Sequence, residues 1–140
     1  MLVKGEKLWY NIFMDHFGLS PLTLAFVGDA VFTLFIRERL ALLDLLPAQL
    51  TKKAAVLVSA VSQSELLAKL DGFLTEDERD IVRRCRNAHT RSRAKNAGVG
   101  EYRRATGLEG LIGHLYLSKD VRLGEVLDKC LEYMDLDYKG

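Results

Sequence analysis

Apolar side chains recur three and four residues apart along nearly the whole chain, and no stretch sustains an alternation of apolar and polar residues. The first pattern is typical of amphipathic helices, whereas alternation is typical of half-exposed strands. A chain of 140 residues has the usual length of one domain around one core. The presence of only two prolines argues against disorder. We therefore expect an all-α fold in which residues 1–140 form a single helical domain.

Capping and breaking residues divide this pattern into segments. Ser20 before Pro21 is typical of a helix start, and Thr75 and Glu78 have the spacing of a capping box. We expect helices over Glu6–Phe17, from Pro21 to about Leu46, over Gln49–Leu70 as one bent helix or two short ones joined near Ser59–Ser62, from Thr75 to about Asn87, over Glu101–Leu117 and over Val121–Met134. An exposed loop is expected over His89–Gly100, which lacks apolar periodicity.

Some classes of protein are disfavoured by what the sequence lacks. The most apolar stretch, Leu22–Ile36, is interrupted by Asp29 and is shorter than the ~20 residues of a membrane-spanning helix. No secretory signal is visible, so we expect a cytoplasmic protein. Cys85 and Cys130 stand far apart and are expected to be reduced thiols. A zinc site or catalytic triad is disfavoured because the histidines are isolated, at His16, His89 and His114.

Positive charge is concentrated in one segment. The net charge is only +1, but Arg83–Arg104 holds eight basic residues and the single acid Glu101, which leaves the rest of the chain net negative. Arginine binds phosphate oxygens through paired hydrogen bonds, and such contacts position a nucleic acid without reading its sequence. A solvated charged loop is the alternative. The candidate nucleic-acid contacts are Arg83, Arg84, Arg86, Asn87, Arg91, Arg93, Lys95, Arg103 and Arg104.

Two carboxylates stand among apolar neighbours. Asp29 lies within LTLAFVGDAVFTLFI, and Glu109 lies within ATGLEGLIGHLYL. An ionised side chain that is removed from water needs a metal ion, a basic side chain or hydrogen-bond donors. For Asp29 alone, a buried ion pair or a capping contact is an equally good interpretation.

Glycines repeat at every third position around Glu109, at Gly107, Gly110 and Gly113. Glycine destabilises a helix interior, so this stripe indicates that another backbone approaches closely. Close packing without any chemistry is the alternative.

The two acids converge on one site if the region of Gly28 packs against this stripe. Adjacent carboxylates repel unless a proton or cation lies between them, and oxygen ligands suit Mg²⁺, which also binds phosphate oxygens. We therefore expect Asp29 and Glu109 to be catalytic residues that bind Mg²⁺.

These residues resemble those of the ribonuclease III catalytic domain. The segment LAFVGDAVF at 24–32 is similar to the signature motif of that family, whose aspartate matches Asp29. The segment ATGLEGLIGHLYL at 105–117 resembles its second acidic motif, whose glutamate matches Glu109. The segment RRCRNA at 83–88 resembles the short Mini-ribonuclease III branch in particular. The likeness covers nearly the whole chain, so we expect no C-terminal double-stranded-RNA-binding domain.

The resemblance implies a Mg²⁺-dependent endoribonuclease that cuts double-stranded RNA as a homodimer and leaves a 5′-phosphate and a 3′-hydroxyl. The implied substrate is a stem in precursor large-subunit ribosomal RNA. The sequence departs from the larger family at Leu22, Ala25 and Thr106, where that family has further acids. A catalytically inactive RNA-binding protein on the same fold is therefore the alternative. A helical module that binds an acidic protein is a third interpretation.

Overall fold

The computed structural model describes residues 18–88, 98–134 and 136, and these contain six helices and no strand. The all-α fold expected from the sequence is confirmed. The helix expected over Glu6–Phe17 lies outside the described residues, as does most of the loop expected over His89–Gly100. The helices are α2 (Pro21–Leu40), α3 (Pro47–Leu57), α4 (Ala60–Leu70), α5 (Glu76–Arg86), α6 (Val99–Leu117) and α7 (Arg122–Tyr133).

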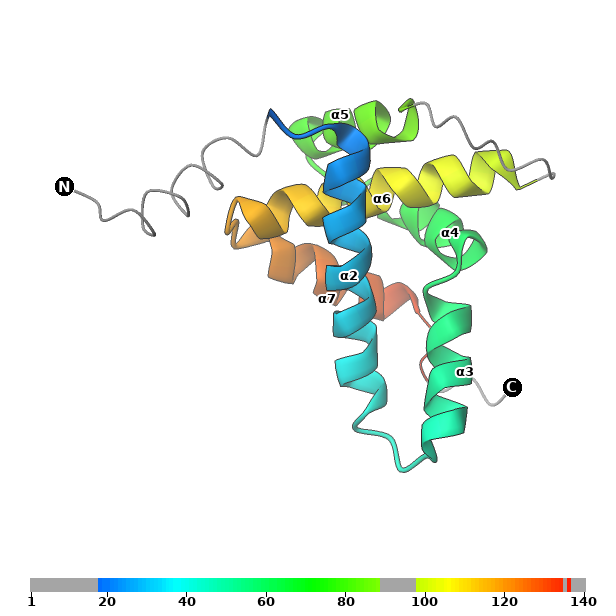
Figure 1. Cartoon of the computed structure of the whole chain (residues 1–140). Coiled ribbons are helices and arrows are strands. Elements are labelled where there is room, and N and C mark those ends of the chain that lie inside the picture. The colour runs from blue at the N-terminus through cyan, green and yellow to red at the C-terminus, as the bar shows by residue number, and fades with distance from the viewer. Residues whose placement is uncertain (1–17, 89–97, 135, 137–140) are drawn as a thin grey trace, which may run out of the picture.

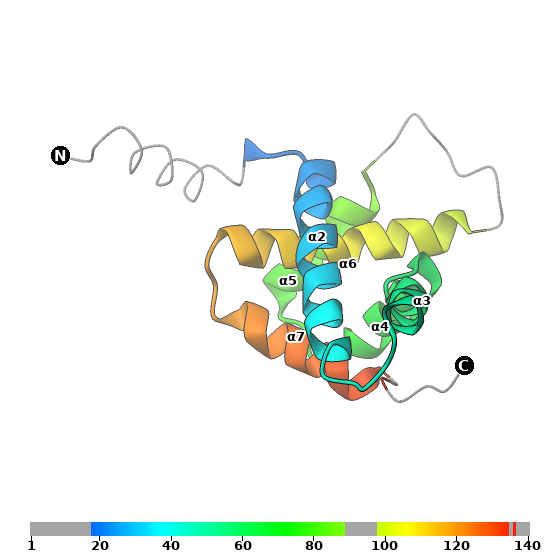
Figure 2. The same ribbon diagram turned by 60° about the horizontal axis from the view of Figure 1, so that its bottom comes forward.

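Helix α6 lies at the centre of the described fold and packs against α2, α4, α5 and α7. Every residue of 105–115 except Glu109 is buried, so this helix has little amphipathic character. The first half of α2 crosses α6, while α5 lies above α6 and α7 below it (Figure 1). The crossing is equally plain from a second direction (Figure 2). The crossing of α2 and α6 is therefore the main contact of the fold.

Helix α2 begins where its capping residue predicts. The side chain of Ser20 accepts a hydrogen bond from the backbone N–H of Thr23 at 3.1 Å, and Pro21 occupies the first turn, where its missing N–H removes no helical bond. Every fourth residue of the helix then faces the core, at Leu24, Gly28, Phe32, Ile36 and Leu40. The first two of these residues, Leu24 and Gly28, lie against α6.

The end of α2 was predicted wrongly, since the helix stops at Leu40 rather than near Leu46. Leu46 has extended backbone angles (φ −70°, ψ 150°), because a residue that precedes proline is disfavoured in the α region. Leu42 and Leu46 are both exposed, so the leucine-rich run forms a turn and not a core segment.

The segment expected over Gln49–Leu70 forms two helices. Helix α3 already starts at Pro47, and α4 starts after Ser59, whose side chain accepts a hydrogen bond from the backbone N–H of Ser62 at 3.2 Å. The break changes the packing partner, because α3 packs mainly on α2 whereas α4 packs mainly on α6.

The capping box that starts α5 is present and has a second role. Thr75 Oγ1 accepts from the backbone N–H of Glu78 at 3.1 Å, and the Glu78 carboxylate accepts from the N–H of Thr75 at 2.9 Å. The same carboxylate accepts a hydrogen bond from Arg122 Nε at 3.0 Å, and Arg122 also donates to the Phe73 carbonyl at 2.7 Å. This buried ion pair fixes the start of α7 against the start of α5.

Cys85 and Cys130 are both buried and not joined by a disulfide, as expected. Burial raises the pKa of the Cys130 thiol to about 12, so this cysteine packs as an apolar side chain. Across the described part of the chain, every helix is too short or too polar to traverse a lipid bilayer.

Candidate active site at the crossing of α2 and α6

Two glycines allow the backbones of α2 and α6 to touch. A side-chain carbon on Gly28 would overlap the backbone carbonyl of Glu109, and one on Gly113 would overlap the carbonyl of Leu24. Both glycines lie inside helices, where glycine is otherwise unfavourable. The expectation that the region of Gly28 packs against the glycine stripe is confirmed at Gly113.

The rest of the stripe faces a different helix. Gly110 lies against the side chain of Cys85, and a side-chain carbon on Gly107 would lie 3.0 Å from the carbonyl oxygen of Val82. Residues three apart on a helix are rotated by about 60° from one another, so the stripe winds around α6. Gly107 and Gly110 therefore allow α5 to approach closely, and Gly113 allows α2 to do so.

The crossing brings the side chains of Asp29 and Glu109 together, although 80 positions separate them in the sequence. Asp29 directly follows Gly28, and Glu109 itself supplies the backbone carbonyl that Gly28 contacts. The carboxyl groups of the two acids lie within hydrogen-bonding distance of one another. The pKa of Glu109 is raised to about 8, first by burial and then by the charge and hydrogen bond of Asp29. Two carboxyl groups in this arrangement attract a proton or a cation.

The two acids differ in exposure. Glu109 is partly buried, but Asp29 is exposed, although both acids stand among apolar neighbours in the sequence. Gly28 faces α6, and Asp29, the next residue, is rotated by about 100° from it around the axis of α2. Phe26, one turn before Asp29 on the same side of α2, is 79% exposed. One carboxylate therefore lies at the rim of the site and the other lies deeper.

At the positions where the larger family has further acids, this chain has an apolar side chain or one that already forms a hydrogen bond. Ala25 is buried, Leu22 is half-buried, and the hydroxyl of Thr106 donates a hydrogen bond to the carbonyl of Tyr102 at 2.9 Å. No group of three or more histidine, cysteine or acidic side chains suited to a metal ion occurs in the parts of the chain that the structure describes. The site is thus an acid pair. Mg²⁺ is commonly held in proteins by only one or two carboxylates, with waters and phosphate oxygens as its other ligands.

One polar residue next to Glu109 was missed by the sequence analysis. Gln63 of α4 is almost fully buried, and its side chain lies beside Glu109, whose pKa it lowers. An uncharged residue in an amphipathic helix gave no signal that it reaches this site.

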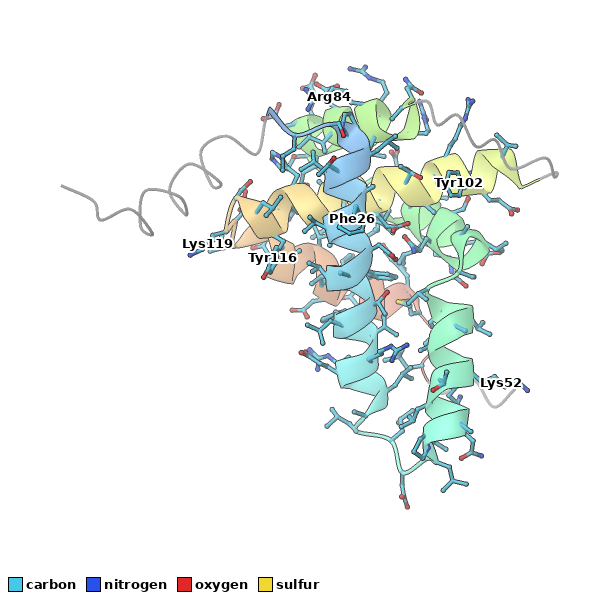
Figure 3. The ribbon with its side chains drawn as sticks, viewed as in Figure 1. Phe26, Lys52, Arg84, Tyr102, Tyr116 and Lys119 are labelled. Atoms are coloured by element: carbon cyan, nitrogen blue, oxygen red, sulfur yellow. The ribbon has the colours of Figure 1, made fainter. Side chains whose placement is uncertain are left out.

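The basic candidates divide into described and undescribed residues. Six are described, and all six are exposed: Arg83, Arg84, Arg86, Asn87, Arg103 and Arg104. The other three, Arg91, Arg93 and Lys95, lie outside the described residues. Arg84 lies at the top of α5, near the start of α2 (Figure 3).

Three of these arginines share one hollow. Its volume is about 580 Å³, and Arg83, Arg86 and Arg104 line it between α4, α5 and α6. Arg104 Nε donates to Ser64 Oγ at 2.5 Å, which fixes the guanidinium against α4. Acids also line the hollow, namely Asp71, Glu76 and Asp80. The pair at the α2–α6 crossing is not among its lining residues.

Comparison with known proteins identifies the family. The sequence matches the family described as "Ribonuclease III domain" over residues 22–120, a range that holds both acids. The chain belongs to the ribonuclease III family. The resemblance read from the two motifs is thereby confirmed, and with it the enzyme class, an endoribonuclease of the ribonuclease III type.

Relatives in this family extend over most of the chain. Mini-ribonuclease 3 of Thermoanaerobacter sp. is 40% identical over 119 residues, which are 84% of this chain and 84% of that protein. Mini-ribonuclease 3 of Brevibacillus brevis is 42% identical over 118 residues, which are 83% of this chain and 88% of that protein. A crystal structure of a Fusobacterium nucleatum protein superposes with a TM-score of 0.72 at 32% identity, covering 85% of this chain and 97% of the other.

Proposed function

We propose that this ribonuclease III-family protein is a Mg²⁺-dependent endoribonuclease that cuts double-stranded RNA, with Asp29 and Glu109 as its catalytic residues. The observation that carries the proposal is the contact between these two carboxyl groups at the α2–α6 crossing. The contact joins the two motifs that resemble the acidic motifs of the family. A catalytic site there explains why two like charges are kept together where one of them is partly buried.

The acid pair suits a magnesium ion. Burial and the neighbouring acid make a lone negative charge on Glu109 unfavourable, and a divalent cation removes that penalty. Mg²⁺ would supply charge stabilisation at the scissile phosphate and a water of lowered pKa. Glu109 is the deeper ligand in this proposal, and exposed Asp29 faces the side from which substrate arrives.

The basic residues suit a phosphate backbone. The arginines at the end of α5 and near the start of α6 are exposed, and Arg104 is already fixed in orientation by Ser64. A-form RNA hides its base edges in a deep, narrow groove, so contacts of this kind recognise backbone and shape. We therefore propose a substrate that is double-stranded and recognised with little sequence preference.

A homodimer is the second part of the proposal. Phe26, one turn before Asp29 on α2, is 79% exposed, and Tyr116 on α6 is 51% exposed. Both aromatic side chains are visible on the side of the molecule where α2 passes in front of α6 (Figure 3). Exposed aromatic residues on one face indicate a protein interface. A second copy of the chain on this face would give a dimer with two acid pairs, one for each strand of a duplex.

The finer details of the proposal rest on the family resemblance. The products are a 5′-phosphate and a 3′-hydroxyl, and the substrate is a double-stranded stem in precursor large-subunit ribosomal RNA. The relatives that carry the name Mini-ribonuclease 3 support this branch of the family.

The experiment that tests the proposal incubates the purified chain with duplex and single-stranded RNA of the same sequence, with Mg²⁺ or with EDTA, and maps the ends. We expect cleavage of the duplex alone, and only with Mg²⁺. Binding of duplex without cleavage would instead support an inactive RNA-binding protein, the alternative favoured by Leu22, Ala25 and Thr106. Absence of salt-sensitive RNA binding would support the helical module that binds an acidic protein.

A further inference from the structure

Gln63 lies in the first turn of α4 and is only 2% exposed. Its side-chain Nε2 donates a hydrogen bond to the carbonyl of Val58 at 3.0 Å. Its Oε1 is buried and has no hydrogen-bond partner among the described residues. Burial of a partly unsatisfied amide is unfavourable, so a glutamine at this position needs a reason other than stability.

The break between α3 and α4 explains how the amide is oriented. In a continuous helix, the carbonyl of Val58 would accept a hydrogen bond from the backbone N–H of Ser62. Here that N–H donates to the side chain of Ser59 instead, at 3.2 Å. The Val58 carbonyl is left to accept from Gln63, and this bond fixes the direction of the amide.

The amide so fixed lies beside Glu109. The two side chains lie close enough for the amide to lower the pKa of Glu109, against the larger effects of burial and of Asp29. An amide N–H beside a carboxylate can donate to one of its oxygens and so restrict the orientation of that group. The next residue, Ser64, accepts a hydrogen bond from Arg104, so adjacent buried side chains of α4 hold two polar groups of α6.

We infer that Gln63 is a positioning residue of the acid pair: its amide, held by the carbonyl of Val58, fixes the Glu109 carboxylate in the orientation needed to share a divalent cation with Asp29. This inference rests on the proposed function, because it assumes that the pair binds such a cation. Gln63 itself touches neither the metal nor the RNA. Groups that orient metal ligands in this way raise metal affinity by about 10–100-fold.

The test replaces the amide and measures metal binding without RNA. Gln63→Met keeps the length of the side chain and removes its donors. Binding of Mn²⁺, and competition by Mg²⁺, are followed on the full chain by the electron paramagnetic resonance signal of free Mn²⁺. We expect the variant to bind Mn²⁺ about 10–100-fold more weakly. Cleavage of duplex RNA should then require more Mg²⁺, with the rate restored at saturating metal.

Ser64→Ala is the matched control for metal binding. It alters the neighbouring residue, which is equally buried but contacts Arg104 and not Glu109. Its affinity for Mn²⁺ should stay within twofold of the unaltered chain. If Gln63→Met does not fold, as judged by circular dichroism, Gln63→Asn takes its place, because an amide shorter by one methylene retains polarity but loses the reach to Glu109.

The outcomes separate this inference from the function on which it rests. If the unaltered chain binds Mn²⁺ and cuts duplex RNA, and a folded Gln63 variant has the same affinity and Mg²⁺ requirement, the role of Gln63 is wrong and the nuclease stands. If the unaltered chain neither binds the metal nor cuts RNA, the proposed function is wrong, and the inference about Gln63 falls with it.

Discussion

Gly28 of α2 touches the backbone of Glu109 in α6, with no room for a side chain between the two helices. The residue that follows Gly28 is Asp29, so this backbone contact also sets the separation of the two acids. Stability and the geometry of the candidate site therefore depend on the same few atoms.

Substitution of Gly28 by alanine should destabilise the protein strongly. The added carbon meets a backbone carbonyl, which cannot move aside as a flexible side chain can. We expect a loss of about 3 kcal/mol or more in the free energy of unfolding, measured by urea denaturation. Gly124→Ala is the control, because Gly124 lies in α7 with nothing nearby. That variant should be more stable by about 0.5–1 kcal/mol. Equal stability of the two variants would contradict the close contact.

Removal of one charge from the acid pair should abolish cleavage and spare the fold. Asp29 is exposed, so Asp29→Asn leaves the packing of α2 unchanged. We expect cleavage of duplex RNA to fall by at least about 100-fold, since loss of a metal ligand removes a few kcal/mol of transition-state stabilisation. Duplex binding in EDTA should persist. Normal cleavage by Asp29→Asn would exclude Asp29 from the mechanism.

The raised pKa of Glu109 predicts how stability depends on pH in metal-free buffer. The folded protein holds the Glu109 proton up to about pH 8, whereas the unfolded chain releases it near pH 4.5. The folded state therefore binds more protons, and its stability should fall as pH rises between these values. The fall should be smaller in Glu109→Gln, compared by thermal melting in EDTA. Parallel curves for the two proteins would contradict the raised pKa.

The basic segment should control the salt dependence of RNA binding. We expect the triple variant Arg91→Ala, Arg93→Ala and Lys95→Ala to bind duplex RNA more weakly and with a shallower dependence on salt. The logarithmic slope should decrease by roughly 0.9 for each phosphate group that the variant no longer neutralises. The control replaces Arg37 and Lys52, which are exposed on α2 and α3. An unchanged slope in the triple variant would place the RNA elsewhere.

The exposed aromatic face should be buried in a dimer. Phe26→Asp should convert a dimer into a monomer in analytical ultracentrifugation, because a charge placed in an apolar interface is left without a partner. Leu42→Asp provides a matched control, since Leu42 is also 79% exposed but lies in the turn between α2 and α3. A chain that is monomeric before substitution would contradict the dimer.

Local features of the fold were predictable from the sequence because their causes lie within a few residues. The caps at Ser20 and Thr75 depend on side chains that bond to backbone three positions away. The end of α2 was not predictable in this way. Leu42 and Leu46 are apolar enough to belong to the core, and only the packed structure shows that neither is buried.

The candidate site was predictable to a similar extent. The glycine stripe correctly indicated a close helix contact, and this brought Asp29 toward Glu109. The exposure of Asp29 was not predictable, because apolar neighbours in the sequence do not reveal which face of the helix they occupy. Gln63 was missed because its position depends on a helix break and on packing between α4 and α6.

The break at Ser59 has a consequence for how sequences of this kind can vary. Helix α3 packs mainly on α2, while α4 packs mainly on α6 and carries Gln63. Insertions or deletions in the turn at residues 41–46 can thus be absorbed before α3 without shifting α4 along its neighbour. Loop length there is free to drift between relatives, and the same stretch is a suitable place to attach a fluorophore or an affinity tag.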